Sequence, residues 1–286
     1  MKTCIAVCLT ALLLIGCSRS GAIVVGSKNF TEQLILGEIA AQQIERKLHV
    51  KVERKLNLGG TLLTHEAILK GDIDIYPEYT GTGASVVLKQ QVPADPAQAY
   101  ITVKDVYFRR FHLVWLPPLG FNDTFAMVVR REDAKRLSAA NLSAATSRAW
   151  RLGIGYEFLT RPDGLTKLNK IYPMRWEGNA KSMDLGLLYQ ALEQRRVDMA
   201  AGNSTDAQLS DPRMVALTDD RKAFPPYNAC FVARESLLQQ KPEVRLALIL
   251  LEDRISDETM RELNRRVEAE HQPITKVARD FLASQP

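Results

Sequence analysis

The chain has 286 residues and a formal net charge of +5 at pH 7. Its basic residues form short, scattered pairs interleaved with acids, without the aromatic and basic stripe typical of a nucleic-acid surface, so we expect no nucleic-acid partner. The length is ample for a buried core and favours two lobes rather than one.

The first residues have the features of a bacterial export signal. An apolar run from Ile5 to Ile15 is too short to span a bilayer, and it ends in L-I-G-C. This ending resembles the lipoprotein cleavage motif, so we expect residues 1–16 to be a signal peptide and Cys17 to carry lipid; a simple secretory signal is the alternative. The mature chain would then lie in the periplasm or cell envelope, with Cys230 as the one cysteine of its folded domain and no internal disulfide.

Strand and helix patterns alternate through the first 120 residues. A first helix is expected to follow Thr31, its N-cap, and to bury an i, i+4 face that includes Ile35, Ile39 and Leu48. The alternation predicts an α/β fold with largely parallel sheets. The other expected elements are strands at 23–26, 50–52, 73–75 and 113–116 and helices at 61–69 and 100–111.

The same order recurs after the first crossing, at residues 121–125. Strands are expected from 126 and at 152–155, 174–176, 197–199 and 214–217, with helices after the loop at 157–165 and over 183–192. The segment F-P-P-Y-N at 224–228 predicts a rigid crossing back to a strand at 230–233, and a helical tail over 242–282 is expected to pack across the first lobe. The predicted lobes are therefore 22–120 plus 228–286, and 121–227.

Two short segments of the chain match each other. Residues 67–75, A-I-L-K-G-D-I-D-I, and residues 191–199, A-L-E-Q-R-R-V-D-M, each indicate a helix end, a basic or glycine turn, and then apolar-Asp-apolar. Continuing this register sets Tyr79 opposite Asn203. We therefore expect two pseudo-equivalent lobes whose strand ends face one another.

A ligand-binding pattern follows the third expected strand, in G-D-I-D-I-Y-P-E-Y-T-G-T from Gly71. Pro77 is expected to end the strand, because proline cannot donate to a sheet ladder. Tyrosine, threonine and glutamate side chains come next, and Gly81 and Gly83 would let the backbone approach a small molecule closely. In α/β sheets, ligands bind at the carboxyl ends of strands.

The sequence lacks the motifs of an enzyme. It contains no G-x-S-x-G, H-E-x-x-H, C-x-x-C or phosphate-binding loop, and Gly153-Ile154-Gly155 lacks the third glycine of a dinucleotide fingerprint. The four histidines have no metal-ligand spacing, and we expect all of them at the surface: His49, His65, His112 and His271. The chain is therefore expected to have no catalytic residues, no cofactor and no metal.

Aromatic residues and two cationic side chains instead indicate a binding site. A permanent cation such as trimethylammonium accepts no hydrogen bond and donates none, so a site recognises it with aromatic faces, which Tyr79, Phe125 and Tyr227 could supply. A carboxylate on the same ligand is best met by the fork of an arginine. Arg161, with Lys28, could serve that end.

Six motifs spread over essentially the whole mature chain resemble those of the osmoprotectant-binding proteins of ABC importers, the glycine betaine/choline/carnitine family. The resemblance implies a two-lobed type II periplasmic-binding fold, monomeric, that closes over its ligand and docks on a membrane permease driven by a cytoplasmic ATPase. The motifs are S-K-N-F-T-E-Q from Ser27, G-D-I-D-I-Y-P-E-Y-T-G-T from Gly71, F-N-D-T-F-A-M from Phe121, E-F-L-T-R-P-D-G-L from Glu157, N-S-T-D from Asn203 and F-P-P-Y-N-A from Phe224.

The resemblance also implies roles for single residues. Tyr79 and Tyr227 match tyrosines of the family's cation cage, and Thr82 matches a polar contact in the same loop. Arg161 matches the carboxylate-binding arginine. Lys28 lies in the motif that faces the carboxylate end of the ligand.

Two positions depart from the family pattern. Asp123 lies in the motif that offers a backbone carbonyl to the cation, but Phe125 and Asn203 occupy positions that are commonly tyrosine. Loss of one aromatic wall at Asn203 should cost about 1 kcal/mol or more of cation attraction, or about tenfold in affinity. The family's subgroup with the same G-N-x-T-D pattern is of this low-affinity kind, and the resemblance is closest to it.

We therefore expect the binding component of an importer that captures a quaternary-ammonium solute such as glycine betaine or choline, in osmoprotection. The space left by Gly202-Asn203 makes larger betaines, ergothioneine among them, an alternative ligand class. An amino acid is a further alternative, because Arg161 would bind its carboxylate equally well. A ligand-sensing lipoprotein of the same fold is the alternative to an import role.

Overall fold

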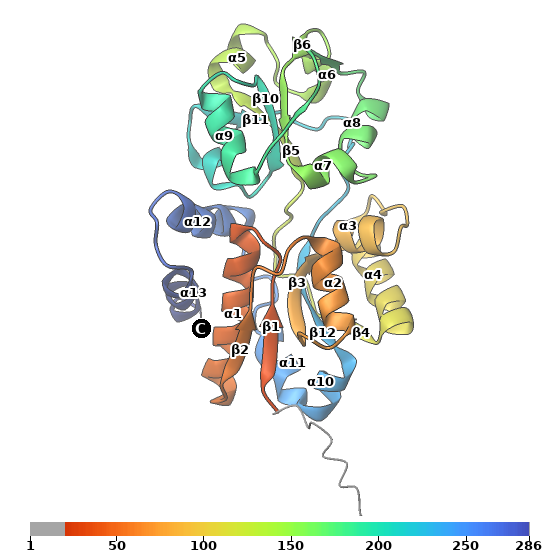
Figure 1. Ribbon diagram of the computed structural model, residues 1–286, viewed down its shortest axis with the longest axis vertical. Coiled ribbons are helices and arrows are strands. Elements are labelled where there is room, and N and C mark those ends of the chain that lie inside the picture. The colour runs from red at the N-terminus through yellow and green to blue at the C-terminus, as the bar shows by residue number, and fades with distance from the viewer. Residues whose placement is uncertain (1–20, 286) are drawn as a thin grey trace, which may run out of the picture.

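The structure is a computed structural model that describes residues 21–285, so the expected signal peptide and Cys17 lie outside the described residues. Two five-stranded sheets flanked by helices lie one above the other along the long axis (Figure 1). We call the lower sheet with its helices lobe 1 and the upper sheet with its helices lobe 2. Within residues 21–285, no helix combines the length and the apolar character needed to cross a membrane.

Lobe 1 contains a mixed sheet with the strand order β2-β1-β3-β12-β4. β1 is parallel to β2 and β3, whereas β12 is antiparallel to β3 and β4. The sheet is therefore mixed, and the prediction of a largely parallel sheet was wrong. The strands are β1 Ile23–Gly26, β2 Val52–Lys55, β3 Ile75–Tyr79, β4 Leu113–Trp115 and β12 Ala229–Arg234. The helices are α1 Thr31–Leu48, α2 Thr61–Leu69, α3 Thr80–Thr82, α4 Pro96–Phe111, α10 Glu235–Gln240, α11 Pro242–Ile249, α12 Asp257–Glu268 and α13 Ile274–Ala283, with a π-helical turn at Gly83–Val87.

Lobe 2 contains a mixed sheet with the strand order β11-β5-β10-β7-β9. The predicted strand at 174–176 forms a separate two-stranded sheet instead, because β8 Arg175–Trp176 pairs with β6 Ala149–Trp150. The main strands are β5 Phe125–Arg130, β7 Leu152–Ile154, β9 Lys181–Ser182, β10 Met199–Asn203 and β11 Met214–Ala216. The helices are α5 Arg131–Arg136, α6 Leu142–Ala145, α7 Tyr156–Thr160, α8 Leu165–Ile171 and α9 Leu185–Glu193, with a 3-10 turn at Ala207–Ser210.

The internal repeat of the sequence is a repeat of structure. β3 and β10 begin and end at residues that the sequence match aligns, so Tyr79 and Asn203 are the last residues of equivalent strands. Each strand lies between a parallel and an antiparallel neighbour. The turn before each strand also repeats, since the backbone N–H of Asp72 bonds to Ala67 O and that of Arg196 bonds to Ala191 O.

Pro77 does not end its strand, contrary to the prediction. It lies within β3, opposite Phe231 of β12. β1 pairs with β3 at Val25 and Ile75, before the proline. The N–H of Thr80 donates to Asn228 O on the β12 side of the sheet. Successive backbone nitrogens of a strand face opposite neighbours, so the nitrogen of Pro77 faces the β1 side. The paired part of β1 has ended at that level, so the proline removes no ladder hydrogen bond.

Two further local predictions need correction. α1 buries Ile35 and Ile39 as expected, but Phe30 is its N-cap and Thr31 is its first helical residue. His65 is buried rather than exposed, with its ring 4.9 Å from that of Phe111. Burial lowers the pKa of His65 to about 4, so the ring is neutral at pH 7.

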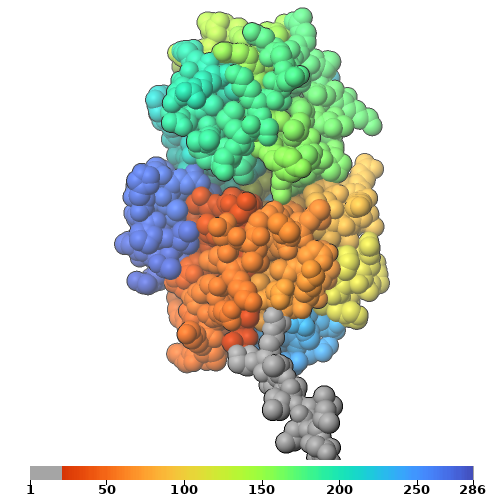
Figure 2. Space-filling model, in the orientation of Figure 1, coloured from red at the N-terminus to blue at the C-terminus, as the bar shows by residue number. Residues whose placement is uncertain are grey.

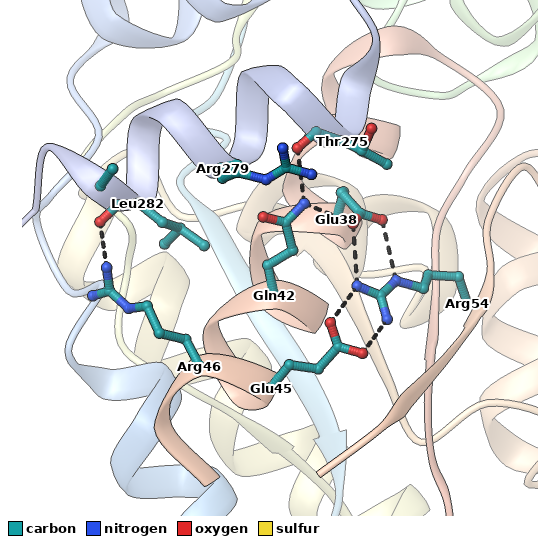
Figure 3. Close-up of a pocket in the computed structure, with 9 residues that line it drawn as sticks. Glu38, Gln42, Glu45, Arg46, Arg54, Thr275, Arg279 and Leu282 are labelled. Carbon is teal, nitrogen blue, oxygen red and sulfur yellow. Dashed lines mark hydrogen bonds and ion pairs between the residues drawn. The ribbon is translucent and has the colours of Figure 1, made fainter. Parts of the chain in front are cut away.

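The C-terminal helices pack on lobe 1, as the sequence predicts. α13 runs beside α1, and Gln42 Nε2 of α1 donates to the carbonyl oxygen of Thr275 at 2.9 Å (Figures 1 and 3). Next to this contact, Arg54 lies between the carboxylates of Glu38 and Glu45 (Figure 3). These residues line a surface pocket of about 430 Å³. Because its polar groups largely bind one another, we interpret it as the packing boundary between α1, β2 and α13 rather than as a ligand site.

Two crossings connect the lobes, one between β4 and β5 and the other between β11 and β12. They run side by side, joined by an antiparallel bridge between Asn122 and Asn228 and by the bond from Asp123 N to Tyr227 O at 3.1 Å. Figure 2 shows the lobes meeting at this waist, with α2 in orange below and α7 in yellow-green above. Glu157 of α7 accepts from the backbone N–H of Thr61 of α2 at 3.3 Å, so the lobes touch.

Candidate functional site

The eight predicted ligand-binding residues lie at or near the ends of strands and helices and in the crossings between the two sheets. The repeat brings the carboxyl ends of β3 and β10 to this region, and the crossings add two further segments. Lys28 follows β1, Tyr79 ends β3, Thr82 lies in α3, Asp123 lies in the first crossing, Phe125 begins β5, Arg161 follows α7, Asn203 ends β10 and Tyr227 lies in the second crossing.

Two of the three predicted cage rings meet. The ring centroids of Phe125 and Tyr227 are 5.5 Å apart with an interplanar angle of 67°, and the ring centroid of Phe224 lies 5.7 Å from that of Phe125. The guanidinium carbon of Arg161 lies 4.9 Å from the Phe125 centroid and 5.5 Å from the Tyr227 centroid. These distances are in the range of cation–π contacts, so the ring pair faces a cation of the protein itself.

Asp163 fixes the position of this guanidinium. Arg161 donates from Nε and NH2 to the two oxygens of Asp163, at 2.9 Å and 2.8 Å. Asp163 Oδ2 also accepts from the hydroxyls of Tyr227 at 2.7 Å and Ser85 at 2.6 Å. Burial alone would raise the pKa of Asp163, but these donors and the charge of Arg161 hold it below its usual value. Because Ser85 belongs to lobe 1, Asp163 also links the two lobes.

The third predicted ring lies in a different environment. Tyr79 stacks on Phe30 with centroids 6.4 Å apart, and its hydroxyl donates to Glu32 Oε1 at 2.6 Å. Lys28 Nζ lies 5.1 Å from the Tyr79 centroid and forms an ion pair with Glu78 at 2.5 Å. Both members of that pair are buried, and desolvation raises the pKa of Glu78 despite the nearby lysine.

Thr82 lies in α3, just beyond the end of β3, and Asn203 is the last residue of β10. Thr82 is buried, and the neighbouring Gly81 faces the protein rather than an open space. A Cβ at Gly81 would lie 2.6 Å from Pro226 O and 2.5 Å from the ring of Tyr227, so this glycine lets the second crossing pack closely. Asn203 is partly buried and stands opposite Phe125 in the antiparallel register of β5 and β10.

Asp123 belongs to a second polar cluster that the sequence reasoning missed in part. The hydroxyl of Thr205 lies 2.7 Å from Asp123 Oδ1 and 2.6 Å from Glu32 Oε2, and Asn264 Nδ2 of α12 donates to Glu32 at 3.1 Å. Burial raises the pKa of Glu32 to about 7 and that of Asp123 well above its usual value. Glu32 and Asp163 lie within motifs quoted above, whereas nothing near Asn264 in the sequence indicates a role at the site.

A further cavity lies beside the crossings. It has a volume of about 890 Å³ and is lined by Phe125, Phe224 and residues of both lobes, including Lys167 and Lys222. Phe125 therefore borders this cavity and also contacts Arg161. Within residues 21–285, no group of three or more His, Cys, Asp or Glu side chains is arranged to hold a metal ion.

The sequence of residues 21–284 matches the model of one protein family, the substrate binding domain of ABC-type glycine betaine transport systems. The chain belongs to this family. Its members are solute-binding proteins rather than enzymes, they act outside the cytoplasm, and they deliver small ligands to ABC permeases. The resemblance found in the six motifs is thereby confirmed, as is the expectation of a binding rather than a catalytic protein.

Individual relatives bind different solutes, by their names. The chain is 35% identical to the ergothioneine transport permease/ergothioneine binding protein of Helicobacter pylori over 91% of its length, and it spans 47% of that longer relative. It is 34% identical to the glycine-betaine-binding protein of Pseudomonas aeruginosa, covering 93% of this chain and 89% of the relative.

The fold is that of solved binding proteins. A crystal structure of a glycine betaine/carnitine/choline ABC transporter protein superimposes with a TM-score of 0.78 at 30% identity, covering 91% of this chain and 97% of the other. The two mixed sheets with flanking helices match this structure, so the predicted type II periplasmic-binding fold is confirmed.

Proposed function

We propose that this chain captures a small solute carrying a permanent positive charge and a carboxylate, such as glycine betaine, between its two lobes and delivers it to an ABC permease. The observation that carries the proposal is the ring pair Phe125–Tyr227, which already faces a cation at 4.9 Å and 5.5 Å. Rings that attract a guanidinium at this distance attract a trimethylammonium group by the same quadrupole.

The carboxylate end of the solute has a matching partner in Arg161. Its guanidinium holds the carboxylate of Asp163 through two parallel hydrogen bonds, the geometry in which arginine binds carboxylates most strongly. A zwitterionic solute would meet both kinds of group within one buried region. We include Lys28, Tyr79, Thr82, Asp123 and Asn203 in this proposed site.

The space beside Phe125 favours a second ligand class. Asn203 replaces a ring at the end of β10, and a cavity of about 890 Å³ adjoins Phe125. Space of this kind suits a betaine that carries a side chain, and a relative of 35% identity is named for ergothioneine. We therefore propose larger betaines as the alternative ligand.

The remaining expectations about the mature protein are proposals of the same kind. We propose lobe bounds of 22–120 plus 228–286 and 121–227, a lipid anchor at Cys17, a periplasmic or envelope location and a monomeric state. The proposed role is osmoprotection by import. A sensory role or an amino-acid ligand would replace that role if no quaternary solute bound.

Calorimetric titration of the purified protein tests the proposal. The solutes are glycine betaine, choline, carnitine and ergothioneine, with glycine as the control that lacks a quaternary nitrogen. We expect saturable binding of at least one quaternary solute, none of glycine, and loss of binding in Tyr227→Ala and Arg161→Ala. Phe108→Ala, which removes an exposed ring on α4, is the matched control and should bind as the unmodified protein does. Glycine binding alone, or no heat with any of the four, would refute a quaternary ligand.

A further inference from the structure

One hydroxyl joins two buried carboxyl groups between the lobes. Thr205 Oγ1, in the loop after β10, lies 2.6 Å from Glu32 Oε2 of α1 and 2.7 Å from Asp123 Oδ1 of the first crossing. All three side chains are buried, with exposed fractions of 1% for Thr205, 4% for Glu32 and 8% for Asp123. The three residues come from lobe 1, lobe 2 and the crossing, so the bridge exists only while the lobes are in contact.

Counting hydrogens shows that this bridge contains an additional proton. A threonine hydroxyl has one hydrogen to donate, yet both contacts are short enough to be strong hydrogen bonds. Two ionised carboxylates cannot both accept from it, so one carboxyl must itself donate to Thr205 Oγ1. Glu32 also accepts from Tyr79 OH and Asn264 Nδ2, which favours its ionised form and assigns the proton to Asp123.

The surrounding groups leave this pair without a countercharge. The charge of Lys28 acts on Asp123, but its ammonium already forms an ion pair with Glu78 at 2.5 Å. Asp206, which is held by the hydroxyl of Tyr189, adds further negative charge. Among residues 21–285, no lysine or arginine forms an ion pair with Glu32 or Asp123. A buried acidic pair of this kind requires a positive charge from elsewhere.

Asn264 supplies an independent indication that the pair accepts a positive group. Its side-chain nitrogen lies in the bridge, donating to Glu32 at 3.1 Å and to Thr205 O at 2.9 Å. Its side-chain oxygen is buried and has no hydrogen-bond partner among the described residues. An unpaired acceptor at 4% exposure beside two carboxyls adds to the local demand for positive charge.

We propose that the Glu32–Thr205–Asp123 bridge is a site for one positive charge, filled by a proton when the lobes meet without a solute and by the cationic head of the solute when they meet around one. The first half stands on the hydrogen count alone, whereas the second half rests on the proposed function. A solute without a fixed positive charge would leave the proton in place. The bridge therefore selects for a cation by charge, in addition to the selection by aromatic faces.

The proposal fixes the direction of a pH effect. In separated lobes water would hydrate both carboxyls and their pKa values would return toward the usual ones. In joined lobes burial raises the pKa of Glu32 to about 7 and raises the pKa of Asp123 well above its usual value. The joined state therefore binds more protons and is favoured at low pH, and this advantage is lost as pH rises through the raised values. One proton changes the ratio of joined to separated lobes by up to about tenfold per pH unit.

Small-angle X-ray scattering of the solute-free protein between pH 5 and pH 8 measures this ratio through the radius of gyration. We expect a compact particle at pH 5 that expands toward pH 8, and a flat profile in Asp123→Asn, whose amide can donate to Thr205 without a titrating proton. Glu32→Gln is the second variant and should also flatten the profile. Asp133→Asn is the matched control, because this buried aspartate is paired with Arg130 and its pKa lies below the usual value. It should keep the unmodified profile.

Saturating glycine betaine or ergothioneine tests the second half. We expect the pH dependence of compaction to disappear, because the solute's charge replaces the proton. A flat profile in the unmodified solute-free protein, or an unchanged slope in both Asp123→Asn and Glu32→Gln, overturns the assignment of the proton. If compaction still depends on pH when a quaternary solute is bound, the proposed replacement of the proton by the solute's cation is wrong. If no quaternary solute binds, the proposed function fails, while the solute-free profile still decides the proton.

Discussion

The substitution Asn203→Tyr tests whether a missing ring limits the affinity of the site. Asn203 stands directly opposite Phe125 in an antiparallel pair, where side chains on the same face lie about 5 Å apart at Cβ. A tyrosine there would add a third aromatic face beside the Phe125–Tyr227 pair. An added cation–π contact contributes about 0.5–2 kcal/mol, so glycine betaine should bind about 2- to 30-fold more tightly.

The same change should act in the opposite direction on a larger solute, because the new ring occupies the space beside Phe125. We expect ergothioneine to bind more weakly to Asn203→Tyr than to the unmodified protein. Asn203→Leu is the matched control, since it fills space without an aromatic ring face and should give no gain for glycine betaine. Calorimetric titration measures all three proteins. Equal gains in the tyrosine and leucine variants would refute the reasoning from the ring.

Three further substitutions test the construction of the site. Tyr227→Phe keeps the ring but removes a hydrogen bond to ionised Asp163, so chemical denaturation should show about 1.5–3 kcal/mol less stability, and an unchanged midpoint would contradict the contact. Gly81→Ala should lose about 1–3 kcal/mol in the same assay, because its Cβ meets the Tyr227 ring at 2.5 Å; full stability would disprove this packing. Hydrogen bonds from Arg151 are the main reason that the pKa of Asp198 lies below its usual value of 3.8. The stabilisation from this pairing is therefore present above pH 3.8 and is lost as the pH falls below it. Asp198→Asn should make stability less dependent on pH in that acidic range, and an unchanged acid-unfolding profile would contradict the role of this pairing.

The repeated strands show what the sequence can predict. The match between residues 67–75 and 191–199 extends to Tyr79 and Asn203, and β3 and β10 end at those two residues. This prediction succeeded because the turn chemistry and the alternation of apolar residues are local properties. Pro77 shows the limit of such reasoning, since its tolerance depends on where the neighbouring strand β1 ends, and that follows from the whole sheet.

The cross-lobe contacts lie beyond local patterns for the same reason. Glu32 is bound by Thr205 and Asn264, which are 173 and 232 residues away in sequence. Their short polar side chains give no periodic signal, and only the packing of α12 near the second lobe brings them to α1. His65 is a smaller example, because its burial depends on the later helix α4, which carries Phe111.

Weak binding of glycine betaine would have two independent physical causes in this chain. Asn203 removes one aromatic wall, and Arg161 already occupies the faces of Phe125 and Tyr227. A solute must therefore compete with that guanidinium for the rings, at a further cost of about 0.5–2 kcal/mol. Restoring a ring at Asn203 relieves the first cause and leaves the second. A gain in Asn203→Tyr that stops short of tight binding is thus what the structure predicts, and the remainder measures the competition from Arg161.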